Sequence, residues 1–92
     1  MISVCIATYN GERYIETQIR SILDQLNEDD EIIISDDSST DRTLDIIRSL
    51  NDSRIKLFAG NKFHSRTFNF ENALKQATGD FIFLSDQDDI WL

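Results

Sequence analysis

Residues 2–35 read ISVCIATYNGERYIETQIRSILDQLNEDDEIIIS, and this stretch decides the fold. Its first and last apolar segments, residues 2–7 and 32–34, are almost continuously apolar, as expected of strands that are covered on both faces. Between them, five apolar residues recur at helical spacing: Ile15, Ile19, Ile22, Leu23 and Leu26. They predict an amphipathic helix over residues 12–27. The acidic run at residues 28–31 reads as a solvated loop. Together these segments predict a βαβ unit with two parallel strands.

The remaining residues continue the same alternation of strand and helix. A second helix is expected to start near Thr40, and residues 54–58 alternate charged and apolar side chains, which is typical of an edge strand. A third helix is predicted to stop at Gly79 as its C′ residue, before the apolar strand at residues 81–84. The order βαβαβαβ predicts an α/β fold with a Rossmann-like parallel sheet and right-handed crossovers. Residues 1–92 are expected to form one domain.

Composition narrows the possible partners. The chain has 92 residues and a formal net charge of −8, so no basic face is available to bind nucleic acid. A phosphorylated ligand would need a cation to offset its charge. The single cysteine, Cys5, excludes a disulfide framework, and no apolar run approaches the roughly 18 residues that cross a bilayer. A cytoplasmic setting is therefore expected, with membrane association only through further sequence.

Polar side chains follow three of the four predicted strands. Ligands bind beyond the carboxyl ends of strands in an open parallel sheet, so residues 8–12, Asp36–Asp37 and residues 86–89 are expected to share one edge. Asp86 and Asp88 form a D-x-D pair that extended backbone would point to the same side. Such oxygen ligands suit Mg²⁺ or Mn²⁺ beside a diphosphate, although a bare D-x-D is also common in solvated loops and helix caps.

The other polar residues each admit two interpretations. Either one of Asp36 and Asp37, or a neighbouring serine, caps the second helix while the other aspartate is solvated, or an aspartate here accepts hydrogen bonds from a ligand. Tyr9 either stacks on a base or wedges its loop, and Glu12 is otherwise an ordinary acid in a first helical turn. His64 reads as a lone exposed histidine. Lys62 and Arg66, in the same loop, could meet a phosphate or simply be exposed.

Four motifs in order resemble a known family: residues 7–10 (ATYN), 35–41 (SDDSSTD), 77–80 (ATGD) and 85–91 (SDQDDIW). They look like the amino-terminal half of a family 2 glycosyltransferase with the GT-A fold, of the type that builds bacterial surface polysaccharides. The resemblance covers nearly the whole chain. The chain departs from the family pattern at Ala7, where proline is common, and at Ser38, where glycine is common.

The resemblance implies a transferase that takes a nucleoside-diphosphate sugar, UDP- or dTDP-linked, and passes the sugar to a saccharide or lipid-linked acceptor. By position, it implies six substrate-binding residues and two metal ligands. Thr8, Tyr9 and Glu12 would surround the nucleoside, Asp37 would bind the base, Asn72 would close the pocket, Asp86 would reach the ribose or the metal, and Asp88 would hold the metal. It also implies the strand order three-two-one-four and an inverting transfer assisted by Mn²⁺ or Mg²⁺.

The family's catalytic base lies well beyond the D-x-D, so the base is expected beyond Leu92 and no residue among residues 1–92 is assigned to it. The chain is therefore expected to be the donor-binding half of a longer enzyme, inactive in transfer by itself. Residues 81–84 are too apolar for an exposed edge, so another strand beside them, or self-association, is expected.

Two alternatives to the transferase stay open. A non-catalytic nucleotide-binding module would carry the same motifs. A receiver-like phospho-acceptor domain would also be a small α/β domain with an acidic pocket, but it needs an aspartate after the third strand, where Ala59-Gly60-Asn61 stands.

Overall fold

The fold was obtained as a computed structural model, which describes residues 1–86. Seven elements follow one another: β1 (Ile2–Thr8), α1 (Ile15–Leu23), β2 (Glu31–Asp36), α2 (Thr43–Leu50), β3 (Ile55–Phe58), α3 (Arg66–Gln76) and β4 (Phe81–Ser85). The strands form one parallel sheet in the order β3-β2-β1-β4. Both the βαβαβαβ order and the three-two-one-four sheet are confirmed, and residues 54–58 supply the edge strand that their alternation predicted.

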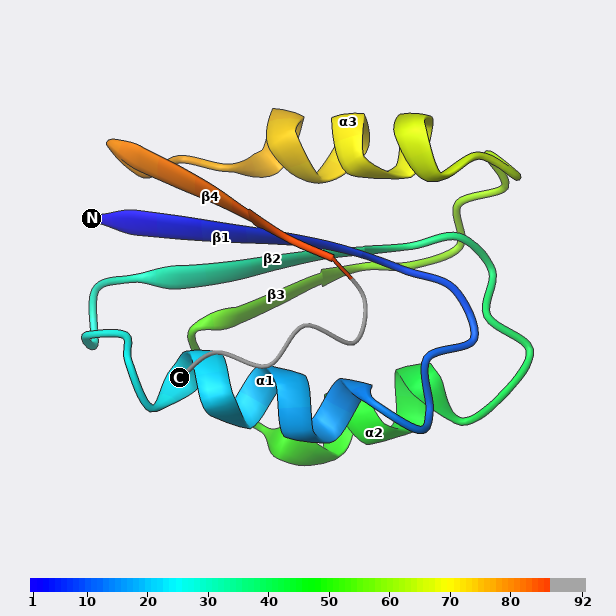
Figure 1. The fold of residues 1–92 in the computed structure, drawn as a ribbon, viewed down its shortest axis with the longest axis horizontal. Coiled ribbons are helices and arrows are strands. Elements are labelled where there is room, and N and C mark those ends of the chain that lie inside the picture. Colours follow the sequence, from blue (N-terminus) through cyan, green and yellow to red (C-terminus); the bar gives the residue numbers. More distant parts are fainter. Residues whose placement is uncertain (87–92) are drawn as a thin grey trace.

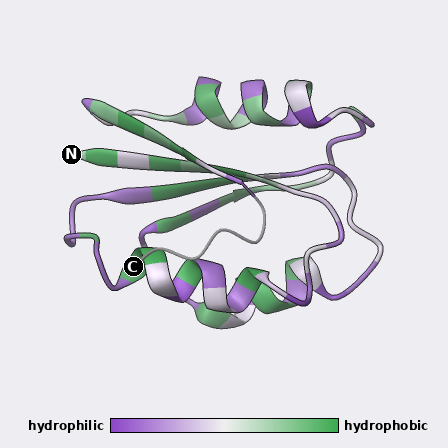
Figure 2. Cartoon of the chain, in the orientation of Figure 1, coloured by the Kyte–Doolittle hydropathy of each residue, from purple (hydrophilic) through white to green (hydrophobic). Residues whose placement is uncertain are grey.

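The helices cover the two faces of the sheet unequally. Figure 1 shows α1 and α2 together on one face and α3 alone on the other. The larger core lies under α1 and α2, and its buried members are Val4, Ile6, Ile15, Ile19, Ile22, Ile32, Ile34 and Ile47. The smaller one, under α3, contains Cys5, Ile33 and Ala73. The central strands are therefore apolar on both faces, and Figure 2 shows this as green along β1 and β2 beside mixed helices.

Helix ends differ from the predicted ones. α1 is shorter than residues 12–27, and α2 begins at Thr43 rather than near Thr40. The third helix ends at Gln76 with an extended Ala77, so the prediction of Gly79 as its C′ glycine is wrong. Gly79 is needed for a different reason: a Cβ there would lie 2.6 Å from the Ser3 hydroxyl and 2.9 Å from the Met1 carbonyl oxygen. The turn before β4 packs too closely on β1 for any side chain.

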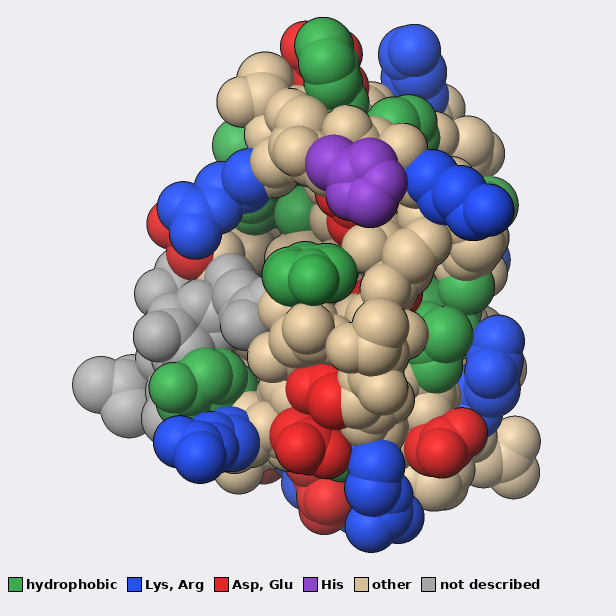
Figure 3. Space-filling model, turned by 90° about the vertical axis from the view of Figure 1, so that its right-hand side faces the viewer, with side chains coloured by type: hydrophobic (Ala, Val, Ile, Leu, Met, Phe, Trp, Pro, Cys, Tyr) green, Lys and Arg blue, Asp and Glu red, His purple; other side chains and the backbone are tan. Residues whose placement is uncertain are grey.

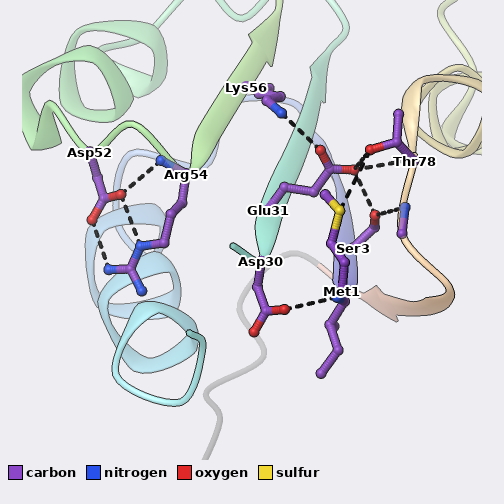
Figure 4. Close-up of polar contacts among 10 residues, drawn as sticks. Met1, Ser3, Asp30, Glu31, Asp52, Arg54, Lys56 and Thr78 are labelled. Carbon is purple, nitrogen blue, oxygen red and sulfur yellow. Dashed lines mark hydrogen bonds and ion pairs between the residues drawn. The ribbon is translucent and has the colours of Figure 1, made fainter. Parts of the chain in front are cut away.

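The acidic run at residues 28–31 is solvated only in its first half, where residues 28 and 29 are exposed as the sequence predicts. Asp30 and Glu31 are buried, and Figure 4 shows both carboxylates pointing into polar partners. Asp30 accepts hydrogen bonds from the backbone N–H groups of Ile2 and Asn27, each at 2.8 Å. These bonds fasten the turn to the start of β1. The hydrophobic pattern missed this because the partners lie in other segments of the chain.

Glu31 is the centre of a polar cluster at the amino end of the sheet. Its carboxylate accepts hydrogen bonds from Ser3 Oγ at 2.6 Å, Lys56 Nζ at 2.9 Å and the Thr78 amide at 2.8 Å. Burial by itself raises the pKa of Glu31, but these hydrogen bonds outweigh it and lower the pKa to about 2. The ionised carboxylate thereby joins β1, β2, β3 and the α3–β4 turn.

β4 is the outer strand of the sheet on the side of β1 within the described residues. Four consecutive large apolar side chains on it are exposed: Phe81, Ile82, Phe83 and Leu84. Pairing with β1 puts Phe81 and Phe83 on the α1 side and Ile82 and Leu84 on the α3 side, so both faces of the strand are apolar. No helix in residues 1–86 combines the length and apolarity needed to span a bilayer.

Candidate functional site

A cavity of about 650 Å³ lies at the carboxyl ends of β1, β2 and β4. It is lined by Ala7, Thr8, Tyr9, Asp37, His64, Ser65, Arg66, Asn69, Phe70 and Asp86. Figure 3 looks at this edge of the molecule and shows the histidine at the surface, with Lys or Arg side chains to either side. The edge expected from the parallel sheet is thus the one that is hollowed.

The cavity brings together four of the predicted site residues, Thr8, Tyr9, Asp37 and Asp86. Two other predicted residues lie elsewhere. The carboxylate of Glu12 accepts the backbone N–H of Arg42 at 3.3 Å, and Asn72 donates to Ser35 Oγ at 3.0 Å beneath the cavity floor. Glu12 and Asn72, which were expected to contact the nucleoside, are therefore not among the side chains that line the cavity.

Two further parts of the predicted site fall outside the described residues. Asp88, the expected metal ligand, belongs to residues 87–92, which the structure does not describe. The catalytic base was expected beyond Leu92, and Leu92 itself belongs to the same undescribed residues. The structure therefore describes the end of β4 up to Asp86, and both the role of Asp88 and the position of the base stay predictions.

The end of β1 is held against the end of β2 by buried polar contacts. Thr8 and Asp36 are both fully buried, and Thr8 Oγ1 donates to Asp36 Oδ1 at 2.6 Å. The same carboxylate accepts the Ser39 amide at 2.8 Å and the Ser39 hydroxyl at 2.6 Å. Asp36 thus organises the loop after β2. The alternative that Asp36 or Asp37 caps α2 is wrong, because Asp41 accepts the Thr43 amide at 2.9 Å instead.

The loops after β1 and β2 are joined to each other next to Tyr9. Asn10 accepts the Thr40 amide at 2.8 Å through Oδ1, and its own amide donates to Ser39 Oγ at 2.9 Å. Asn10 and Ser38 both have left-handed backbone, with φ of 49° and 57°. Ser38 occupies the position where the family pattern has glycine, and its positive φ is the physical reason for that pattern.

Asp37 holds the loop between β3 and α3. Its carboxylate is nearly buried and accepts the Phe63 amide at 2.7 Å on one oxygen and the Ser65 amide at 3.1 Å on the other. His64, between these two residues, has a φ of 51°. The loop is further tied by Asn61, whose side-chain amide donates to the carbonyl oxygens of Asp36 and Phe58. One carboxylate therefore both lines the cavity and holds the loop that contributes His64 and Ser65 to the lining.

Asn69 is a site residue that the sequence analysis missed. It is buried on α3, where it donates to the Thr8 carbonyl oxygen at 3.1 Å and accepts from Ser35 Oγ at 2.7 Å. A signal was available, because Asn69 stands three residues before Asn72 and shares its helix face. The hydrophobic pattern of this helix drew attention to Phe70 and Ala73 instead. Asn69 anchors α3 to β1 and β2 under the cavity.

The end of β4 is positioned by α1. Gln18 is fully buried and donates to Ser85 Oγ at 3.0 Å and to the carbonyl oxygen of Asp86. This places Asp86 on the cavity wall, one strand beyond Thr8 and two beyond Asp37. In residues 1–86, no three His, Cys, Asp or Glu side chains gather closely enough to form a metal site. Asp86 is the described half of the D-x-D, and its hard oxygen donors fit Mg²⁺ or Mn²⁺.

Curated glycosyltransferases are similar in sequence to this chain. The dTDP-rhamnosyl transferase RfbG of Shigella flexneri is 43% identical over 94% of this chain and 32% of its own length. A UDP-glucose:GlcNAc-diphosphoundecaprenol glucosyltransferase of Escherichia coli, WfaP, is 41% identical over 100% of this chain and 37% of its own length. The chain therefore spans about a third of these curated relatives.

Solved structures share the fold. TarS 1–349 of Staphylococcus aureus, in complex with UDP-GlcNAc, superposes with a TM-score of 0.86 at 32% identity, covering 97% of this chain and 27% of TarS. A mannosyltransferase of Pyrobaculum calidifontis, in complex with GDP-Man and Mn²⁺, gives a TM-score of 0.86 at 26% identity, covering 98% of this chain and 28% of that one. The sheet of this chain matches the amino-terminal part of the GT-A glycosyltransferase fold.

The family assignment does not depend on any one relative. A sequence model described as glycosyl transferase family 2 matches residues 3–92. That match includes the four motifs of the sequence analysis, and it leaves the receiver-like alternative without support. The parallel sheet, the cavity at its carboxyl edge and the sequence match agree: this chain belongs to glycosyl transferase family 2.

Proposed function

We propose that this chain binds the nucleoside-diphosphate sugar donor of a glycosyltransferase that builds bacterial cell-surface polysaccharide. The observation that carries the proposal is the cavity, because it gathers Thr8, Tyr9, Asp37 and Asp86 from the ends of three strands. A nucleoside diphosphate needs an aromatic or apolar surface for the base, polar groups for the ribose and a cation for the phosphates. The cavity offers an aromatic ring and polar groups directly, and it offers a carboxylate that could bind the cation.

The nucleoside is proposed to lie toward Asp37 and the diphosphate toward Asp86. β1 separates β2 from β4, and neighbouring strands lie roughly 4.8 Å apart, so the ends of β2 and β4 stand on the order of 10 Å apart along the edge. This is about the reach of a nucleoside. Tyr9 is 56% exposed on the cavity wall, which leaves its ring accessible to a base.

Asp86 and Asp88 would hold a divalent ion, Mn²⁺ or Mg²⁺. When bound, such an ion neutralises charge on the departing diphosphate. The formal net charge of −8 supports this role, because the protein supplies little positive charge of its own. Arg66 brings a permanent positive charge to the cavity lining, which also contains the carboxylates of Asp37 and Asp86. The complex of the Pyrobaculum mannosyltransferase with GDP-Man and Mn²⁺ supports the use of a divalent ion here.

The transfer step is proposed to be inverting, with the sugar passing to an acceptor hydroxyl. The catalytic base for that hydroxyl is expected beyond Leu92, so residues 1–92 would bind the donor without completing the reaction. The E. coli relative acts on a diphosphoundecaprenol-linked sugar, which supports a lipid-linked acceptor and work at the cytoplasmic face of the membrane. UDP and dTDP are the candidate nucleotides, because the named relatives use donors of both kinds.

Calorimetric titration of UDP and dTDP, each with and without MnCl₂, tests the donor site. We expect at least one nucleotide to bind and Mn²⁺ to strengthen its binding. Asp86→Asn and Asp88→Asn should each remove the Mn²⁺-dependent part of the affinity, by roughly tenfold or more. Asp24→Asn, which removes one exposed charge at the end of α1, is the matched control and should bind like the wild type. Metal-independent binding that survives Asp88→Asn would contradict the proposed metal site.

If residues 1–92 are the donor-binding half of a longer protein, as proposed, that protein tests the transferase activity itself. Membranes carrying undecaprenyl-diphosphate-linked GlcNAc and a radiolabelled UDP- or dTDP-sugar should yield a labelled lipid product. Product formation that needs Mn²⁺ or Mg²⁺ and fails in Asp88→Asn supports the proposal. Tight nucleotide binding without any turnover would instead favour a non-catalytic nucleotide-binding module.

A further inference from the structure

We infer that His64 contacts the nucleobase of the donor and contributes to the choice of nucleotide. The inference rests on the proposed donor-binding function and assigns a role to a residue that neither the motifs nor the spacing of the sequence indicated. Three observations carry it: the place of His64 on the cavity wall, the carboxylate that fixes its backbone, and its left-handed backbone conformation.

The place of His64 identifies which part of the ligand it can reach. His64 belongs to the loop that Asp37 holds, and Asp37 follows β2. Asp86 follows β4, on the far side of β1. A nucleotide whose diphosphate lies beside Asp86 must therefore point its nucleoside toward Asp37 and His64. The imidazole stands at the base end of the cavity rather than at the phosphate end.

The backbone on both sides of His64 is held by one side chain. Asp37 accepts the amide of Phe63 at 2.7 Å and the amide of Ser65 at 3.1 Å, so the two neighbours of His64 are bound to the same carboxylate. Ser65 is also the N-cap of α3, where its hydroxyl accepts the Phe68 amide at 3.3 Å. The position of His64 is thus set by the sheet and by α3 together.

His64 has a left-handed backbone conformation and an exposed side chain. A φ of 51° is less favourable for a residue with a Cβ than for glycine. Asn10 and Ser38, in the other loops at this edge of the sheet, share this conformation. Backbone of this kind concentrates at functional sites. In the loop after β3 it places an exposed imidazole on the cavity wall.

The chemistry of imidazole suits the edge of a base. A neutral ring carries one N–H donor and one acceptor nitrogen, and bases present carbonyl oxygens and ring nitrogens in the same plane. The charged groups on the lining elements around it are Asp37 after β2, Arg66 on α3 and Asp86 after β4. With Tyr9 available to cover the face of the base, His64 would supply a hydrogen bond to its edge.

The test compares nucleoside with nucleotide binding in two variants. His64→Gly relieves the backbone strain, and His64→Asn keeps the tolerance of positive φ with a side chain too short to reach the base. We expect each variant to lower the affinity for the nucleoside and for the nucleotide by the same factor of roughly three to ten, whether the pair is uridine and UDP or thymidine and dTDP. The midpoint of urea unfolding should be unchanged in His64→Asn and unchanged or higher in His64→Gly. Lys75→Ala, an exposed change on α3 outside the cavity lining, is the matched control and should bind like the wild type.

Several results would overturn the inference. Loss of UDP affinity without loss of uridine affinity would place the imidazole at the phosphates. Unchanged affinity in both variants would leave His64 without a role in binding, and a lower unfolding midpoint in both would make its role structural. Failure of the donor-binding proposal is distinguishable, because the wild-type protein itself would then bind neither UDP nor dTDP in the presence of Mn²⁺.

Discussion

The hydroxyl of Thr8 donates a 2.6 Å hydrogen bond to the carboxylate of Asp36, between the last residues of two paired parallel strands. Both side chains are fully buried, and Thr8 is also part of the cavity lining. Asp36 is thus a structural acid, whereas its neighbour Asp37 lines the cavity. Asp36 is the last residue of β2 and Asp37 the first residue after it, so the strand holds the first carboxylate in the sheet while the second reaches the cavity and the β3–α3 loop.

Thr8→Val should destabilise the fold by about 1–3 kcal/mol, because it removes the hydroxyl that satisfies a buried carboxylate while it keeps the side-chain volume. Urea unfolding at pH 7 measures the change. Thr67→Val, at an exposed position on α3, is the matched control and should stay within about 0.5 kcal/mol of the wild type. Equal stability of Thr8→Val and the control would show that the Thr8–Asp36 bond adds nothing.

Acid should weaken the fold through Glu31. The pKa of Glu31 is lowered from 4.5 to about 2, so the folded state keeps this carboxylate ionised where the unfolded chain would protonate it. The resulting stability is fully present above the unfolded pKa and is lost as the pH falls from about 5 to about 2, on the order of 3 kcal/mol in total. Urea midpoints measured from pH 7 to pH 2 should show this decline.

Glu31→Gln is the variant that isolates this effect. It should be less stable than the wild type at pH 7, because a neutral amide pairs poorly with the Lys56 ammonium and with the Thr78 amide. Its stability should also fall less steeply in acid than that of the wild type. Glu28→Gln, which removes an exposed carboxylate from the same turn, serves as the control. A wild-type acid slope in Glu31→Gln would contradict the assignment.

Gly79→Ala should destabilise the turn before β4. The added Cβ would lie 2.6 Å from Ser3 Oγ and 2.8 Å from the Ser3 amide nitrogen, so β1 or the turn must move. Overpacking of this kind costs about 1–3 kcal/mol. Gly60→Ala has open space around the new methyl group but a φ of +81°, so its cost should be nearer 1 kcal/mol. Thermal or urea unfolding measures both losses. A larger loss of stability in Gly60→Ala than in Gly79→Ala would contradict the steric argument.

The 92-residue chain should self-associate through β4. Ile82 and Leu84 are 46% and 59% exposed on one face of an outer strand, and such an apolar edge favours pairing with another copy. Sedimentation velocity over a range of concentrations should show oligomers for the wild type and mostly monomer for the Ile82→Lys, Leu84→Lys double variant. Phe68→Lys, at an exposed apolar position on α3, is the control and should behave like the wild type. A wild-type chain that stays monomeric at high concentration would count against this prediction.

Local pattern was sufficient for the architecture. Short apolar runs such as residues 32–34, rich in β-branched side chains, favour central strands, and the periodic stripe from Ile15 to Leu26 favours a helix packed on them, so the βαβαβαβ order followed from local pattern. The same logic placed Thr8, Tyr9, Asp37 and Asp86 at one edge, because parallel strands present their carboxyl ends together.

Tertiary contacts decided what local pattern could not. Asp30 and Glu31 look solvated in the sequence, but they are buried because Ile2, Ser3 and Thr78 bring hydrogen-bond donors to them from distant segments. His64 looks like an ordinary loop histidine until Asp37, 27 positions earlier in the chain, binds the amides on either side of it. Hydrophobic periodicity records which face of an element is buried. The partner of a polar group depends on segments that meet only when the chain folds, and it is absent from any local window of sequence.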